Sequence, residues 1–203
     1  LLNGAVVTLQ VFFIVIVLSI PLGIVLAFLM QIKFKPLNWL LTLYVWIMRG
    51  TPLLLQLIFV YYVLPSVGIV FDRLPAAILA FTLNYAAYFA EIYRSGIESM
   101  PVGQYEAAEI LGYSKSQTFL HIILPQVIKR ILPSVTNEVI TLVKDTSLAF
   151  VIAVSEMFTI AKALASSQTS MVPYVAAGIF YYVFNFLVAW IMEKIEKHLS
   201  YYR

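Results

Sequence analysis

Hydroxyl-bearing and ionisable residues follow one another at helical spacing in an otherwise apolar part of the sequence. They are separated by four, three and four positions, at Ser134, Glu138, Thr141 and Asp145. Because an α-helix turns once in about 3.6 residues, these side chains are expected to share one face. Charged groups in an apolar setting are costly and by default indicate function. A free amino acid carries an ammonium and a carboxylate, the two charges that such a face could neutralise.

Lys144 borders the same face and is adjacent to Asp145 in the sequence. Neighbouring residues of a helix do not face each other, so Lys144 and Asp145 each need a partner elsewhere. Two interpretations stay open. The first predicts Glu138, Thr141, Lys144 and Asp145 as substrate-binding residues. The second is a structural ion pair with another helix or with a second copy of the chain.

A helix interruption is predicted at Gly50-Thr51-Pro52. This sequence is typical of a helix that ends at glycine, followed by a helix with a threonine cap and a proline in its first turn. A broken membrane helix exposes amides that suit a substrate carboxylate. Thr51 is therefore a candidate substrate-binding residue, although a simple kink explains the sequence equally well. Asn84 is a second candidate for a polar contact, whereas Glu91 and Arg94 are expected to pair with each other.

The elements that position these residues are predicted to be membrane spans. Of the 203 residues, 62% are apolar and only 11% are charged, against about 25% charged in soluble domains. The ranges 1–32, 50–71 and 163–192 carry no charge, and each exceeds the roughly 20 residues that cross a bilayer core. A soluble protein of this size could not bury several such helices. We predict an all-α membrane protein, one domain over residues 1–203, with five spans at roughly 6–32, 40–64, 74–93, 132–155 and 172–192.

The basic residues indicate how these spans are oriented. Nine of the thirteen lie in three segments on one side, at 33–35, at 94–133 and from 193 onwards, and only Arg73 and Lys162 lie on the other. Basic loops stay in the cytoplasm, so the N-terminus is predicted outside and the C-terminus inside. The first apolar stretch is longer than the core of about 7–15 residues in a secretory signal, so we expect it to remain as a span.

Several kinds of chemistry are excluded or disfavoured. There is no cysteine, and the two histidines, His121 and His198, are far apart, so no metal site is expected. No two of the eight glycines are five positions apart, although a phosphate-binding loop requires that spacing, so the chain is not its own ATPase by that mechanism. No basic cluster interleaved with aromatics suggests nucleic acid. No catalytic triad lies inside the spans, which disfavours a membrane enzyme.

The cytoplasmic segment at 94–133 has strong local signals. Residues 106–111 form good helical sequence, and Gly112 follows at a position suited to a left-handed cap. Residues 114–117, Ser-Lys-Ser-Gln, have the spacing of a capping box. A second short helix is expected to run to Leu124-Pro125, where the proline ends or kinks it. The segment is therefore predicted to be a helix–turn–helix that could dock on a partner.

This segment resembles the EAA loop of binding-protein-dependent ABC importers. It has Glu106-Ala107-Ala108, three residues, Gly112, nine residues, Ile122, one residue and Leu124-Pro125, which is the spacing of that family. Five flanking motifs resemble the polar amino acid permeases of the histidine, glutamine and arginine type. They are found at 49–52, 90–97, 101–104, 124–126 and 144–148. The resemblance extends from the first predicted span to the last.

The resemblance implies a type I ABC importer permease fold, with the coupling loop between the third and fourth of five transmembrane helices. It implies a second permease subunit, identical or paralogous, and an extracytoplasmic amino-acid-binding protein. It also implies an ATP-binding subunit that docks on the 101–125 loop and holds ATP and Mg²⁺, so this chain needs no cofactor. The implied location is the lipid of a bacterial cytoplasmic (inner) membrane. The implied coupling residues are Glu106, Ala107, Ala108, Gly112, Leu124 and Pro125, and the 144–148 motif adds Ser147 to the substrate residues.

The expected function is thus ATP-driven uptake of a polar or basic amino acid. Arginine, lysine or histidine is favoured because several carboxylates lie near the predicted pathway. The alternative is a secondary amino acid transporter driven by an ion gradient, in which the acidic face would serve equally well as a proton or cation site. The cytoplasmic loop discriminates between them, because a secondary transporter does not need a dock for an ATPase.

Overall fold

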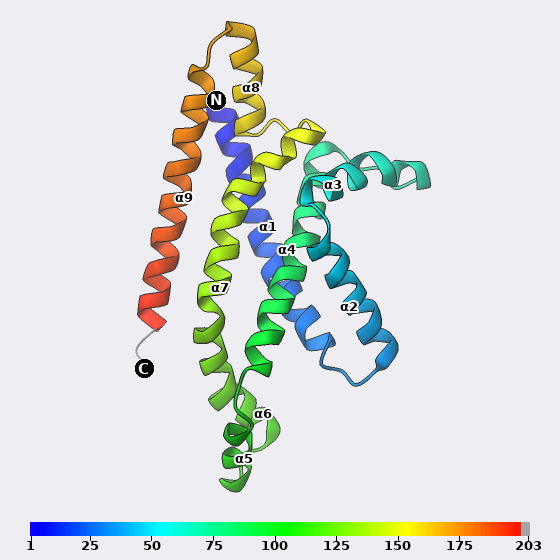
Figure 1. Ribbon diagram of the computed structural model, residues 1–203, viewed down its shortest axis with the longest axis vertical. Helices are drawn as coiled ribbons and strands as arrows, with labels where there is room; N and C mark the ends of the chain where they lie inside the picture. Colours follow the sequence, from blue (N-terminus) through cyan, green and yellow to red (C-terminus); the bar gives the residue numbers. More distant parts are fainter. Residues whose placement is uncertain (200–203) are drawn as a thin grey trace.

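The computed structural model describes residues 1–199, and the regular elements in that range are helical, as predicted (Figure 1). In chain order they are α1 (Leu2–Leu29), α2 (Lys35–Gly50), α3 (Leu53–Ile58), the π-helix η1 (Phe59–Val63), the 3-10 helix η2 (Leu64–Val67), α4 (Arg73–Glu98), α5 (Val102–Ile110), α6 (Lys115–Gln117), the π-helix η3 (Thr118–Ile123), α7 (Leu124–Asp145), the 3-10 helix η4 (Thr146–Ile152), α8 (Met157–Gln168) and α9 (Val172–Leu199).

Helix α4 lies at the centre, and its most extensive contact is with α1. The two helices approach closely because residue 23 has no side chain: a Cβ on Gly23 would lie 2.6 Å from Cβ of Phe89. The core beside this contact is built from buried apolar side chains, among them Val11, Val15, Phe81 and Leu142. Helix α4 is thereby held in place from end to end, and it carries the polar residues Asn84, Tyr85 and Glu91.

The predicted second span is not one straight helix. Helix α2 ends at Gly50, and the chain from α3 to Val67 leaves it at an angle of 109°. Thr51 and Pro52 both have extended backbone, with φ values of −119° and −62°. The predicted interruption is confirmed, but the predicted threonine cap is wrong. The Thr51 hydroxyl donates to the carbonyl of Ile47 at 2.7 Å, in the helix before the break, and Pro52 occupies the N-cap of α3.

The predicted stop at Pro125 is also wrong. The chain stays helical from Lys115 through η3 and α7 to Ile152. Pro125 lies in the first turn of α7, directly after the π-helix, where a missing N–H is tolerated. The helix ends instead at Ala153, which has a positive φ of 55°. Helix α8 then continues at an angle of 56° to the preceding helix, in a region where no helix was predicted.

The number of spans follows only in part from the helices. Among residues 1–199, α1 and α9 are long and apolar enough to cross a membrane, and there are up to four spans if each bent pair counts as one. Helix α4 has sufficient length, with 26 residues, but is less apolar. Its position explains this, because a helix surrounded by protein can carry Asn84 and Glu91 without exposing them to lipid.

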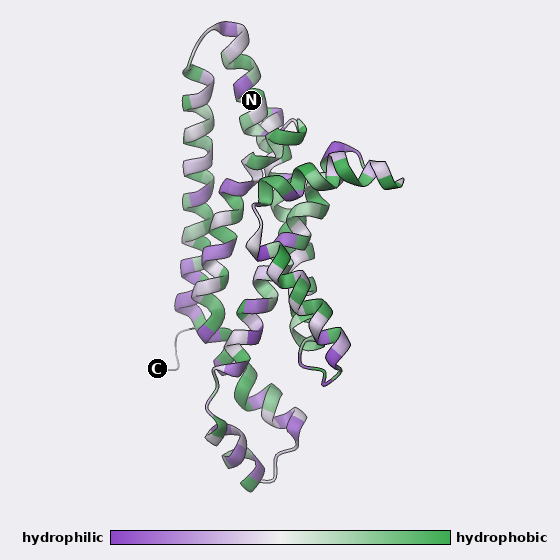
Figure 2. Ribbon diagram, turned by 45° about the vertical axis from the view of Figure 1, so that its right-hand side comes forward, coloured by the Kyte–Doolittle hydropathy of each residue, from purple (hydrophilic) through white to green (hydrophobic). Residues whose placement is uncertain are grey.

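The surface of α9 fits a lipid environment. Its side chains that are more than half exposed repeat at helical spacing along one face, at Val175, Ile179, Tyr182, Phe186 and Trp190. Such a face is costly in water but not against lipid tails. Figure 2 shows hydrophobic residues along the length of this helix and hydrophilic ones at its lower end.

Figure 1 also groups the loops as the basic residues predict. The α1–α2 turn, α5, α6 and the end of α9 lie toward one end of the molecule, and Leu2 and α8 lie toward the other. Arg203, one of the basic residues used in the sequence argument, lies outside the described residues.

Candidate functional site

One face of α7 carries the polar residues that the sequence singles out. Ser134, Glu138, Thr141 and Asp145 lie on a continuous helix and therefore share a face, as predicted. Glu138, Thr141 and Asp145 are half-buried. The Tyr85 hydroxyl of α4 donates to Oδ2 of Asp145 at 2.7 Å. Asp145 thus finds its partner sixty residues away in the sequence, on a buried side chain that is 2% exposed.

Glu138 differs from Asp145 in having no such partner. Within residues 1–199, no side chain or backbone group donates a hydrogen bond to its carboxylate, and no ion pair reaches it. It interacts electrostatically with Asp145, which repels it, and with Arg49 of α2, which attracts it. A half-buried carboxylate with a second carboxylate nearby is a site for a cation.

Lys144 and Ser147 lie at the end of the same helix. Lys144 is exposed, and its backbone carbonyl accepts a hydrogen bond of 2.7 Å from the Ser147 hydroxyl. This bond belongs to the turn from α7 into the 3-10 helix η4. The structure therefore brings Lys144, Asp145 and Ser147 together by local geometry, while the ammonium of Lys144 points away from the core.

A second polar group surrounds the break between α2 and α3. The Asn84 amide donates to the carbonyl of Met48 at 2.9 Å and to Oε1 of Gln56 at 3.0 Å. The Gln56 amide donates in turn to the Thr51 hydroxyl at 2.8 Å and to the carbonyls of Met48 and Thr51. The carbonyls left without helical partners at the break are satisfied in this way. Gln56 is a residue that the sequence analysis missed, and its position just after the predicted break was the available signal.

Thr51 and Gln56 also line a pocket of about 320 Å³, whose other walls are apolar. Asn84 is 4% exposed and lies beneath this pocket, with both amide hydrogens bound inside the chain. Thr51 is thus accessible and Asn84 is not. Their predicted contact with substrate is a prediction that the geometry makes easier for Thr51 than for Asn84.

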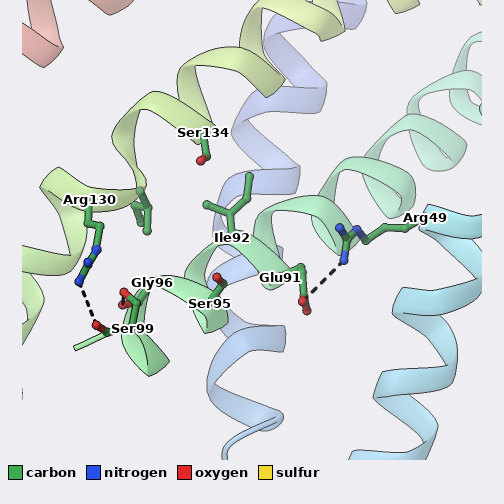
Figure 3. Close-up of a pocket in the computed structure, with 9 residues that line it drawn as sticks. Arg49, Glu91, Ile92, Ser95, Gly96, Ser99, Arg130 and Ser134 are labelled. Carbon is green, nitrogen blue, oxygen red and sulfur yellow. Dashed lines mark hydrogen bonds and ion pairs between the residues drawn. The ribbon is translucent and has the colours of Figure 1, made fainter. Parts of the chain in front are cut away.

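A charged cluster occupies the end of α4 toward the 94–133 segment. Arg94 donates to Glu91 at 2.6 and 3.1 Å, as predicted, and to both oxygens of Glu98 at 2.7 Å. Arg49 extends from α2 to within 3.7 Å of Glu91 and lies 5.4 Å from the ring centre of Tyr88. Figure 3 shows Arg49 and Glu91 facing each other at the edge of a pocket. Two arginines therefore share Glu91.

The turn after α5 has the predicted geometry. Gly112 has a positive φ of 80°, the conformation that glycine adopts at low cost. Its N–H donates to the carbonyl of Glu109, and the N–H of Tyr113 donates to the carbonyl of Ala108, both at 3.0 Å. These two bonds define the Schellman motif that ends a helix. The capping box at Ser114 and Gln117 is also confirmed.

The exposed side of this helix–turn–helix is apolar. Val102, Ile110 and Leu111 are 70%, 86% and 73% exposed at the tip of the molecule. Glu106 and Ala107 are exposed as well, whereas Ala108 is 1% exposed and packs within the segment. At the start of α7, Leu124 is half-buried and Pro125 is exposed. Apolar side chains presented in this way are typical of a protein–protein contact.

The segment is fixed to the helices above it. Met100, Ile123 and Val127 form a small buried core between α4 and α7. Arg130 of α7 donates to the carbonyl of Ser99 at 2.9 Å, just after the end of α4. The loop is therefore a rigid continuation of two long helices, which is what force transmission between a docked partner and those helices requires.

Residues 19–201 match the family described as binding-protein-dependent transport system inner membrane component. The chain belongs to this family.

Individual relatives define the family branch. The L-cystine transport system permease protein TcyB of Bacillus subtilis is 37% identical over 92% of this chain and 82% of its own length. The arginine transport system permease protein ArtQ of the same organism is 36% identical over 98% of this chain and 92% of its own length. A crystal structure of an amino acid ABC transporter with histidines superposes with a TM-score of 0.90, at 30% identity over 97% of this chain and 92% of that chain. The chain is thus the permease subunit of an amino acid ABC importer, with the type I permease fold.

The permease holds one further buried cluster that the sequence analysis missed. Glu156 is fully buried before α8 and accepts hydrogen bonds from the backbone N–H of Phe158 and Thr159, from the Thr159 hydroxyl and from the Tyr181 hydroxyl. The lengths of these bonds run from 2.6 to 2.8 Å. Beside it, the N–H of Met157 donates to Thr8 of α1 at 3.1 Å. The cluster joins α1, α8 and α9 at the end of the permease opposite α5.

No group of three or more His, Cys, Asp or Glu side chains in the part of the permease from residue 1 to 199 is arranged to hold a metal ion. The polar groups of the permease instead fall into two sets along α4 and α7. One set is acidic, with Glu138 and Asp145, and the other is rich in arginine, with Arg49 and Arg94.

Proposed function

We propose that this permease forms the translocation pathway for a polar or basic amino acid, and that the α7 face with Glu138, Thr141 and Asp145 lines that pathway. The observation that carries the proposal is the half-buried carboxylate of Glu138, which has no cation bound to it among residues 1–199. A carboxylate in such a setting is stabilised when a cation reaches it. The ammonium of an amino acid, or a basic side chain, supplies that cation. Lys144, Ser147, Thr51 and Asn84 are assigned to the same pathway as further polar contacts.

The substrate class is narrowed by charge. Two carboxylates face the proposed pathway, and the Tyr85 hydroxyl neutralises neither of them because it is itself uncharged. An amino acid with a cationic side chain brings two positive groups and balances both. The relative ArtQ is named for arginine and TcyB for cystine, so the family accommodates substrates of different charge. We assign a basic amino acid, such as arginine, lysine or histidine, on the strength of the carboxylates.

The energy source is a separate ATP-binding subunit that docks on the 101–125 loop. Val102, Ile110 and Leu111 offer the apolar contact, Glu106 and Ala107 its rim, and Gly112 the turn that presents it. Leu124 and Pro125 connect the dock to α7. In this arrangement an extracytoplasmic binding protein delivers the amino acid, a second permease subunit completes the pathway, and the N-terminus lies outside a bacterial cytoplasmic membrane.

The test is the Glu138→Gln variant, assembled with the ATPase subunit and the binding protein. One lost charge-assisted hydrogen bond is worth about 1.5–3 kcal/mol, so the substrate concentration for half-maximal ATPase stimulation should rise roughly tenfold to hundredfold. Assembly and basal ATPase should persist, because glutamine keeps the shape. Glu193→Gln is the matched control, since it removes an exposed carboxylate at the end of α9.

L-arginine and L-glutamine as substrates resolve which cation Glu138 binds. A loss for both indicates the α-ammonium, and a loss for arginine alone indicates the side chain. A variant that assembles and responds to both amino acids as the unaltered complex does would remove Glu138 from the site. A variant that fails to assemble would assign Glu138 to a structural ion pair with the second subunit.

A further inference from the structure

A pocket between α4 and α7 lies at the lower end of the polar α7 face (Figure 3). Its volume is about 390 Å³, and ligand sites for small molecules typically have about 300–1,000 Å³. Ser134, the first residue of the α7 face, lies in its wall. A molecule that moves along that face from Asp145 past Glu138 therefore arrives in this pocket.

The pocket has a charge pattern opposite to that of Glu138 and Asp145. Figure 3 shows Arg49 of α2 at one side and Arg130 of α7 at the other, with Glu91 beside Arg49. Two guanidinium groups thus face one carboxylate, and Glu91 is already shared with Arg94, which lies outside the pocket. The pocket therefore has an excess of positive charge.

The donors in this pocket are only partly used. Arg130 donates through Nη1 to the Ser99 carbonyl at 2.9 Å, and Arg49 approaches Glu91 no closer than 3.7 Å, with 41% of its side chain exposed. The hydroxyls of Ser95 and Ser134 are exposed on the α4 and α7 walls. A planar guanidinium binds a carboxylate through two parallel hydrogen bonds, which suits it to this ligand group better than a lysine.

The pocket is rigid where α4 and α7 meet. A Cβ on Gly96 would collide with the side chain of Ile131 and would lie 3.2 Å from Cγ1 of Val127. The absence of that Cβ lets the two helices touch at the floor. The hydrogen bond from Arg130 to Ser99 closes the end of the pocket just before α5 begins.

We propose that this pocket is an exit subsite that binds the α-carboxylate of the transported amino acid through Arg49 and Arg130, with Glu91 available to its ammonium. The proposal rests on the proposed function, because it takes the α7 face to be the pathway. The chemical class of ligand is a free α-amino acid, which presents both charges on one carbon. The amino acid leaves an acidic site that holds its cationic groups and enters a basic one that holds its carboxylate.

The test measures ligand binding to the complex of permease and ATPase subunit, without nucleotide or binding protein. The probe is whichever of L-arginine, L-glutamine and L-cystine stimulates the ATPase of the full system, together with its amide, which lacks the carboxylate. The Arg49→Gln and Arg130→Gln variants should bind the amino acid about tenfold to hundredfold more weakly and the amide unchanged. Arg49→Lys should restore part of the lost affinity.

Arg94→Gln is the matched control, because it removes an arginine from the same cluster but not from the pocket. It should leave the preference for the carboxylate intact. The proposal is overturned if the pocket variants bind the amino acid as tightly as the unaltered complex does. It is also overturned if they lose the amide and the amino acid equally, or if the unaltered complex does not distinguish the two.

The Glu138→Gln variant, measured in parallel, separates this proposal from the proposed function. If Glu138→Gln weakens binding and the pocket variants do not, the exit subsite fails and the α7 pathway stands. If the pocket variants selectively lose the carboxylate ligand while Glu138→Gln has no effect, the subsite stands and the role of Glu138 fails.

Discussion

Replacing Glu156 by alanine should be among the most destabilising single changes in this permease. The carboxylate is fully buried and accepts four hydrogen bonds. Two of the donors are backbone N–H groups in the first turn of α8, whose loss as a capped pair costs about 0.5–2 kcal/mol. A third is the Tyr181 hydroxyl at 2.8 Å, and a hydrogen bond to a charged group contributes about 1.5–3 kcal/mol. Together they predict a loss of about 2–5 kcal/mol in the free energy of unfolding.

Two further variants separate these contributions. Tyr181→Phe removes one hydrogen bond to the carboxylate and should cost about 1.5–3 kcal/mol. Glu156→Gln keeps one acceptor oxygen of two and should fall between Tyr181→Phe and Glu156→Ala.

The measurement is denaturant or thermal unfolding of the purified complex in detergent, followed by tryptophan fluorescence. The variants should rank with Glu156→Ala least stable, then Glu156→Gln, then Tyr181→Phe. Equal stability of Glu156→Ala and Tyr181→Phe would refute the reasoning, because it would mean that the α8 cap contributes nothing.

Two other outcomes follow from the coupling loop and from the sidedness of the chain. Gly112→Trp should insert in the membrane and lose ATP-driven uptake, whereas Gly68→Trp should keep it. Both glycines have positive φ and open space at Cβ, so only their positions differ, and equal uptake by the two variants would exclude the docking role. Single cysteines at Lys115 and Lys162, introduced into a chain without cysteine, should react with a membrane-impermeant reagent only from the cytoplasm and only from outside, respectively. Reaction of both from one side would contradict the topology.

Features set by neighbours in the sequence were predicted well. The Schellman turn at Gly112 and the capping box at Ser114 depend on residues within five positions of each other, so their types and spacing specify the geometry. The Glu91–Arg94 pair and the shared face of Glu138 and Asp145 follow from helical periodicity for the same reason. The break at Thr51 was predicted because proline and glycine interrupt helices wherever they occur together.

Features set by tertiary contacts were not predictable. The partner of Asp145 is Tyr85, on another helix, and nothing in the sequence near either residue specifies that pair. Glu156 looked like a loop residue because its partner Tyr181 is twenty-five positions away. Pro125 was expected to end a helix, but the π-helix before it changes the hydrogen bonding at its position. Local propensity gave way to packing in these places.

ATP-driven uptake in proteoliposomes tests the central claim most directly. The permease is reconstituted with its ATPase subunit and its binding protein, and radiolabelled L-arginine, L-glutamine and L-cystine are offered outside. The account predicts uptake of at least one of them that requires ATP on the ATPase side, persists when ionophores collapse all ion gradients, and weakens in the Glu138→Gln variant. Uptake that proceeds without ATP and stops when the gradients are collapsed would contradict the account.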